Sequence, residues 1–120
     1  MRDLRHVDGS VVCERCGIAD NFFSRMRGLL GRRQLPDDEC LLIRPAGSIH
    51  TFFMRFPIDA LFLDRELRVL AVSNDLKPWR VAGQRGARVV VEMAAGQASK
   101  RGVQVGEQLA LGEARAPHGA

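Results

Sequence analysis

The sequence contains no tyrosine, one tryptophan and three cysteines, and each shortage argues against a class of protein. Proteins that bind single-stranded nucleic acid stack the bases on aromatic side chains, so a chain with so few large aromatic rings is poorly supplied for that task. An odd number of cysteines without an export signal argues against a disulfide framework. No apolar run approaches the roughly 20 residues of a membrane span. We therefore expect a cytoplasmic protein with no membrane contact and no nucleic-acid partner.

Lysine is scarce as well, because only Lys77 and Lys100 accompany the arginines among the 18 basic residues. The formal net charge is +4, but the basic residues are scattered along the chain. Their densest cluster is Arg25, Arg27, Arg32 and Arg33. Net charge speaks to solubility and association rather than to fold, and this pattern is typical of a solvated, arginine-rich surface.

The length of 120 residues predicts one domain, residues 1–120. With 46% apolar and 27% charged residues, the chain has the composition of an ordinary globular protein. The polar residues 1–10 and the tail 113–120 are expected to be loose, which leaves a core of about residues 11–112.

The hydrophobic pattern predicts a mostly β protein. Apolar alternation or short two-sided apolar runs indicate strands at residues 11–19, 40–44, 58–63, 67–73, 87–94 and 107–111. One helix is expected to begin at Asp20 or Asn21 and to end at Gly31, and a second, at residues 94–101, to end at Gly102. Residues 74–86 are expected to form a long loop. The connections are short, so we predict an α+β fold with a mostly antiparallel, curled or barrel-like sheet and two short helices.

Residues 50–64 are the richest part of the chain, because they hold four of the six phenylalanines. Burying a phenylalanine ring gains about 1.5–3 kcal/mol, so Phe52, Phe53 and Phe56 are expected in the core. His50 and Asp59 lie in the same segment, and polar groups taken inside need partners. Core packing and a possible site therefore coincide here.

Two interpretations of the nearby charges stay open. Glu92 lies inside the apolar run 89–93, where an unpaired charge is costly. Arg25 or Arg27 could lock Glu92 or Asp59 in a structural ion pair. Alternatively, Asp59 or Glu92 acts as an acid/base group with His50 as its partner.

Cys13 and Cys16 have the spacing of a zinc knuckle and are followed by Gly17. In a regular strand, however, residues i and i+3 point to opposite faces. A tetrahedral zinc site also needs four ligands, and only Cys40, His6 and His50 remain as candidates. Zinc at Cys13 and Cys16 is thus a secondary hypothesis, and free thiols with no cofactor are the primary one.

Three segments together resemble a bacterial and archaeal family, the domain of unknown function 192. Residues 25–30 are similar to its Arg-x-x-Gly-Leu-Met motif, and residues 53–64 to its aromatic, Pro-Leu-Asp and Phe-x-Asp pattern. Residues 91–96 and 102–107 are similar to its Leu-Glu-x-x-x-Gly and Gly-Ile-x-x-Gly-Asp motifs. Leu30 and Glu107 depart mildly from these patterns, and the Cys13/Cys16 pair is foreign to them. The resemblance implies a small, mostly β domain and supplies no agreed activity.

The sequence therefore leads to three functional hypotheses. The first is a non-catalytic module that binds a small ligand or a protein partner in a polar cleft near His50 and Asp59, with these residues around it: Arg25, Arg27, His50, Met54, Asp59, Trp79 and Glu92. The second is a hydrolase that uses Asp59, Glu92 and His50. The third is a metal-stabilised accessory protein that uses Cys13 and Cys16.

Overall fold

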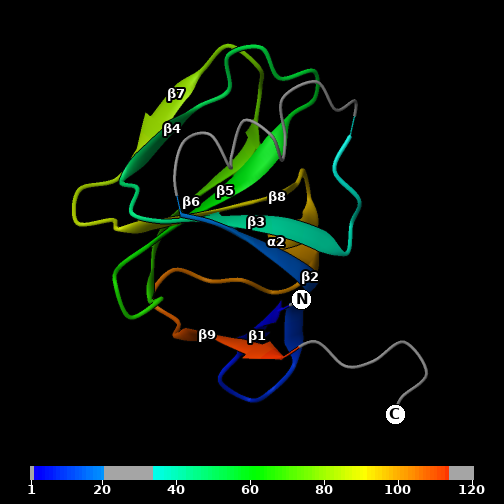
Figure 1. Ribbon diagram of the computed structural model, residues 1–120, viewed down its shortest axis with the longest axis vertical. Helices are drawn as coiled ribbons and strands as arrows, with labels where there is room; N and C mark the ends of the chain where they lie inside the picture. The colour runs from blue at the N-terminus through cyan, green and yellow to red at the C-terminus, as the bar shows by residue number, and fades with distance from the viewer. Residues whose placement is uncertain (1, 21–33, 114–120) are drawn as a thin grey trace.

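The computed structural model describes residues 2–20 and 34–113 of the chain (Figure 1). The helix predicted to begin at Asp20 or Asn21 lies outside these residues, as do Arg25 and Arg27. The elements in chain order are β1 (Arg2–His6), β2 (Val11–Ala19), β3 (Glu39–Ile43), β4 (Ser48–His50), β5 (Ile58–Leu63), β6 (Val69–Leu76), β7 (Val81–Gly83), β8 (Val89–Ala94), α2 (Gln97–Lys100) and β9 (Leu109–Glu113).

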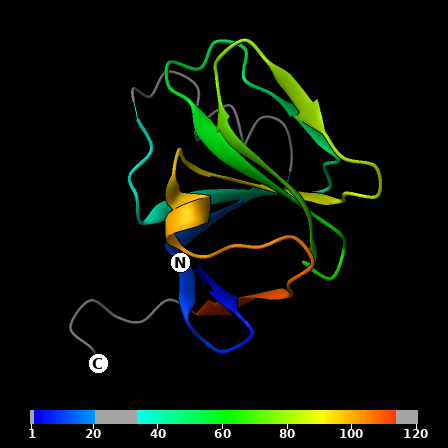
Figure 2. The same ribbon diagram turned by 180° about the vertical axis from the view of Figure 1, so that it is seen from behind.

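Seven strands form one sheet in the order β6-β5-β8-β3-β2-β1-β9, and β4 and β7 form a separate two-stranded sheet. Every pair is antiparallel except β2 and β3, which are parallel. The large sheet curls into a half-barrel (Figures 1 and 2), and its two edge strands meet at one end through a bridge between Arg68 and Gln108. There the Val69 N–H donates to the Glu107 carbonyl at 2.9 Å.

Most of the predicted strands are confirmed. The bounds of β2 and β5 agree with the predicted residues 11–19 and 58–63, and β5 is buried on both faces as its apolar run indicates. The short helix near residue 100 is present as α2 and is the single helix among the described residues. These residues are thus mostly β, which supports the α+β prediction in part.

Two predictions were wrong. The N-terminal residues are not loose, because β1 pairs with β2 on one side and with β9 on the other, and Leu4 is buried between them. The segment 74–86 is not one irregular loop, since β6 runs on to Leu76 and β7 pairs with β4. The pairing of β1 with β9 and that of β7 with β4 join residues far apart in the sequence, which a local pattern does not reveal.

The two faces of the curled sheet bury two separate cores. The inner face contributes Leu61 and Met93 to a core that also contains Ala98 of α2. The outer face contributes Phe62 and Val90 to a second core with these residues of the covering segments: Ile49, Met54, Phe56 and Ala87. Alternate residues of β5 and β8 therefore point into different cores, as the strand period of two requires.

Within the described part of the chain, none of the helices combines the length and the apolar character needed to cross a membrane.

A histidine ties β1 to the far end of the chain. His6 Nδ1 lies 2.5 Å from Glu107 Oε1, and His6 Nε2 lies 2.7 Å from the carbonyl oxygen of Arg101. Partial burial disfavours the charged ring, but the hydrogen bonds to Glu107 and to the Arg101 carbonyl outweigh it and raise the pKa of His6 above its usual value. Only the doubly protonated ring can donate to both oxygens at once.

This contact predicts a pH dependence of stability. A raised pKa in the folded state stabilises the fold at pH values below the pKa of the unfolded histidine, about 6.5. That contribution is lost as the pH rises through the higher folded pKa. We expect the melting temperature to fall between pH 6 and pH 8, and His6→Gln to flatten the profile in that range. A His6→Gln profile that still falls as steeply would contradict the assignment.

Candidate functional site

Asp59 is fully buried and its carboxylate is occupied by backbone donors. Asp59 Oδ1 accepts from the Asp75 N–H at 2.8 Å, and Asp59 Oδ2 accepts from the N–H groups of Gly96 and Ala98, both at 3.0 Å. Gly96 is the N-cap residue of α2, and it has no side chain with which to cap that helix. Asp59 therefore satisfies the donors at the start of α2 and joins β5, β6 and α2.

Glu92 is also fully buried, but it lies on the other face of the sheet. In the pairing of β5 with β8, Asp59 lies opposite Met93 and Ala60 lies opposite Glu92. Residues that face each other across a strand pair share a face of the sheet, so Glu92 stands on the outer face with Ala60. The two carboxylates consequently do not face a common cleft, and this arrangement disfavours Asp59 and Glu92 as an acid/base pair.

Met54 lies in the outer core and is almost fully buried. It contributes packing rather than an exposed contact surface. His50 and Trp79 are the remaining described candidates for the polar cleft. They lie together near the Ile58 end of β5.

An aromatic platform forms at that end, and we use this name for the side chains of Phe52, Phe53 and Trp79. The rings of Phe52 and Trp79 are stacked with centroids 5.6 Å apart, and Phe53 meets Trp79 edge-on at 4.8 Å. His50 extends the platform, since its ring lies 5.0 Å from that of Phe52. Phe53 is 66% exposed and Trp79 is 56% exposed. The expectation that Phe52 and Phe53 are core residues was therefore wrong, whereas Phe56 is buried as expected.

Thr51 holds the two loops of the platform together, and the sequence pattern gave no sign of it. Its hydroxyl donates to the Lys77 carbonyl at 2.7 Å and accepts from the Arg80 N–H at 2.8 Å. Its backbone N–H donates to the Arg80 carbonyl at 2.8 Å, and its carbonyl accepts from the Trp79 N–H at 3.1 Å. A lone threonine in an apolar segment has no signature, so only the contact between residues 51 and 77–80 identifies its role.

The backbone of the platform is strained. Phe53 has φ 68° and Trp79 has φ 65°, in the left-handed region that bulky side chains rarely adopt. Such conformations cost about 1–3 kcal/mol each and persist only where surrounding contacts enforce them. The hydrogen bonds of Thr51 supply that enforcement, and the strain presents both rings to solvent.

The three cysteines lie together in the inner core, which the regular strand pattern did not predict. Leu4 faces Cys13 and Arg2 faces Cys16, so two steps along β1 match three along β2. This bulge places Cys13 and Cys16 on one face, where Cys16 pairs in register with Cys40 of β3. Hydrogen bonds with the other two thiols, together with burial, raise the pKa of Cys40.

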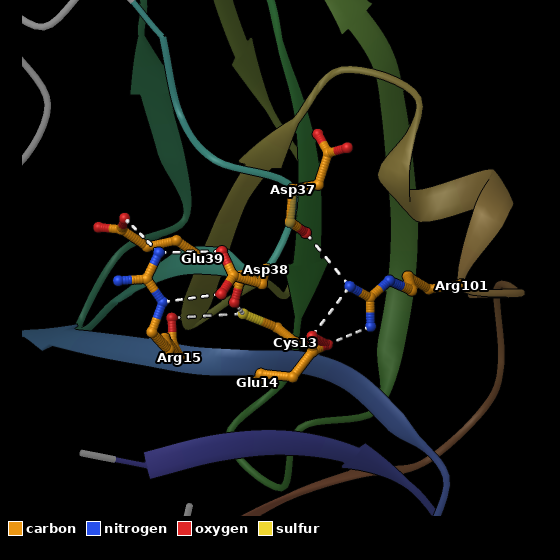
Figure 3. A network of polar contacts seen from close by, with 7 residues as sticks. All are labelled: Cys13, Glu14, Arg15, Asp37, Asp38, Glu39 and Arg101. Carbon is orange, nitrogen blue, oxygen red and sulfur yellow. Dashed lines mark hydrogen bonds and ion pairs between the residues drawn. The ribbon is translucent and has the colours of Figure 1, made fainter. Parts of the chain in front are cut away.

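A polar network covers Cys13 from outside (Figure 3). Arg15 makes a two-pronged ion pair with Asp38, with contacts of 2.9 and 3.0 Å, and Arg101 makes one with Glu14. The Cys13 thiol donates to the Asp38 carbonyl at 3.4 Å. Among residues 2–20 and 34–113, no group of three or more His, Cys, Asp or Glu side chains is placed to hold a metal ion.

Comparison with known proteins identifies relatives over most of the chain. Residues 5–111 match the family DUF192, described as "Uncharacterized ACR". A UPF0127 protein of Pyrococcus abyssi is 36% identical over 98 residues, covering 77% of this chain and 81% of that protein. A UPF0127 protein of Thermococcus sibiricus is 32% identical over 114 residues, covering 88% of this chain and 71% of that protein.

Two crystal structures share the fold. A protein of unknown function from Novosphingobium aromaticivorans superposes with a TM-score of 0.75 at 20% identity, covering 91% of this chain and 82% of that one. A proposed transcription regulator from Sinorhizobium meliloti gives a TM-score of 0.76 at 21% identity, covering 91% of this chain and 90% of that one. At these identities the likeness concerns the fold alone.

Proposed function

Since the chain belongs to the uncharacterised DUF192 family, we propose a function from its own surface: it is a non-catalytic binding module whose contact surface is the aromatic platform. The observation that carries the proposal is the mutual contact of three exposed aromatic rings on two hydrogen-bonded loops. Exposed aromatic rings lose the free energy of burial unless a partner covers them. Here the fold also maintains backbone strain to keep two of them outside.

The composition of the platform supports a protein or peptide partner. Residues that dominate the affinity of protein interfaces are enriched in Trp, Tyr and Arg. Arg55 and Arg80 are exposed in the same two loops as the rings, whereas Lys77 is already paired with Asp75 at 2.6 Å. An aromatic surface flanked by arginines suits a segment that carries an apolar anchor and acidic groups.

Binding rather than catalysis is also favoured by the burial of Asp59 and Glu92 on opposite faces. His50 is then a neighbour of the platform rather than a general base. Its ring contact with Phe52 enlarges the surface that a partner can cover.

Trp79 is the sole tryptophan of the chain, so its fluorescence reports directly on the platform. We would titrate the protein with a library of acidic peptides that each contain one aromatic residue. At least one peptide is expected to shift or quench Trp79 emission and to raise the melting temperature. Phe52→Ala and Phe53→Ala should each lower the affinity for that peptide about tenfold or more, which is the loss typical of an interface anchor.

Val105→Ala provides the matched control, because Val105 is similarly exposed but lies outside the platform. It should bind like the parent protein. The proposal fails if no peptide changes Trp79 emission, or if the peptides that do so bind Phe52→Ala and Phe53→Ala as tightly as the parent. Unchanged melting temperatures of the free variants would show that the platform is a surface and not a part of the core.

A further inference from the structure

A cavity lies at the opposite end of β5 from the aromatic platform. Its volume is about 440 Å³, and it is lined by Arg44, Pro45, Arg65, Leu67, Arg88 and Val89. The platform lies near the Ile58 end of β5, whereas Arg65 lies just after the Leu63 end. A strand of six residues extends for roughly 17–20 Å, so the two places are separate.

Three chain segments meet at this cavity, and their backbones are fixed. Arg44 follows β3 and Arg88 precedes β8, the neighbouring strand. The Arg88 N–H donates to the Leu63 carbonyl at 2.8 Å, and the Arg88 carbonyl accepts from the Ala46 N–H at 2.9 Å. Arg65 lies in the turn between β5 and β6, where the Leu67 N–H donates to the Asp64 carbonyl at 3.0 Å. The arginines are thus held around one hollow by the fold.

The charges around the cavity are mostly unbalanced. Arg44 forms an exposed ion pair with Asp20 at 3.1 Å. For Arg65 and Arg88, residues 2–20 and 34–113 provide no carboxylate within ion-pair distance. The nearby carboxylate of Asp64 accepts instead from the backbone N–H groups of Glu66 and Arg68, both at 2.9 Å. Like charges gathered around one hollow repel each other, and an anion relieves that repulsion.

The remaining lining residues, Pro45, Leu67 and Val89, are apolar. A hollow of this size with apolar walls and a few convergent charged groups is typical of a small-molecule site. Guanidinium groups bind carboxylates with two parallel hydrogen bonds. We infer that this cavity binds a small amphipathic anion, a carboxylate on a short aliphatic tail, with the head group at Arg65 and Arg88 and the tail against Leu67 and Val89.

Isothermal titration calorimetry with octanoate, used below its micelle-forming concentration, tests the inference. Octanoate is expected to bind one site per chain. Three matched probes separate the contributions: octanol lacks the charge, octylammonium reverses it, and acetate lacks the tail. Each should bind at least tenfold more weakly than octanoate. Raising the salt concentration should weaken the binding of octanoate, because salt screens the attraction between exposed charges.

Variants identify the place. Arg65→Gln and Arg88→Gln should each raise the dissociation constant about tenfold, which corresponds to one lost charged hydrogen bond. Arg85→Gln is the control, since Arg85 is an exposed arginine that does not line the cavity. Octanoate should leave Trp79 emission unchanged and should bind Phe52→Ala normally, which keeps this site distinct from the platform. Equal binding of octanol, full affinity in the Arg65→Gln/Arg88→Gln double variant, or absence of octanoate binding would each overturn the inference.

Discussion

Asp59→Ala is expected to remove a large part of the stability of the fold. The substitution leaves the N–H groups of Asp75, Gly96 and Ala98 without their acceptor. Each unsatisfied buried donor costs about 1–3 kcal/mol, and two of the three are only partly buried, so we expect a loss of about 3–6 kcal/mol. The whole stability of a typical domain is about 5–15 kcal/mol. Urea denaturation followed by circular dichroism measures the change.

Asp64→Ala is the matched control for Asp59→Ala. Asp64 Oδ1 also accepts two backbone N–H groups, but in an exposed turn where water replaces it. We expect a loss of about 1 kcal/mol there. Asp59→Asn tests the same point more gently, because a carboxamide offers one acceptor oxygen and turns a donor toward the remaining N–H. If Asp59→Ala were as stable as Asp64→Ala, Asp59 would not be the structural link that its contacts indicate.

Thr51→Val should both destabilise the fold and release the aromatic platform. Valine has nearly the same shape but lacks the hydroxyl, so the Lys77 carbonyl and the Arg80 N–H lose their partner. Two such losses amount to about 2–4 kcal/mol. The loops are then joined by the backbone hydrogen bonds of residue 51 but not by its side chain, so the strained φ angles of Phe53 and Trp79 can relax. We expect Trp79 emission to change already in the native baseline, before the unfolding transition.

Thr51→Ser separates the hydroxyl from the methyl group. Serine keeps both hydrogen bonds and loses one methyl group, a change worth about 0.8 kcal/mol. Its Trp79 emission should resemble that of the parent protein. Equal emission spectra for Thr51→Val and Thr51→Ser would show that the hydroxyl does not hold the loops in place.

The strands that could be predicted from the sequence are those whose own residues determine them. The run 58–63 is apolar on both faces, and β5 is accordingly buried on both faces. The three-residue strands β4 and β7 were missed, because they are too short for a pattern and pair across more than thirty residues. Likewise β1 is polar in sequence and becomes a strand through β2 and β9 on its two sides.

The residues of the candidate site could be selected from the sequence, but their contacts could not. The sequence grouped His50, Asp59 and Trp79 around one polar cleft. In the structure, His50 and Trp79 lie against Phe52, whereas the Asp59 side chain is fully buried. The sequence could not reveal that backbone donors occupy the Asp59 carboxylate, because those donors lie in two other segments, the end of β6 and the start of α2. Nor could the sequence reveal that Phe52 and Phe53 point outward. Their orientation depends on the hydrogen bond of the Thr51 hydroxyl to a loop more than twenty residues away.

The bulge in β2 has a practical consequence. Because it turns Cys13 inward beside Cys16 and Cys40, every sulfhydryl of the chain is shielded from solvent. A dissolved aromatic disulfide reagent can reach them only while β2 separates from β1 or β3. The rate of labelling under native conditions therefore measures how readily β2 separates from its neighbouring strands. The three thiols thus serve as internal probes of local opening in the curled sheet.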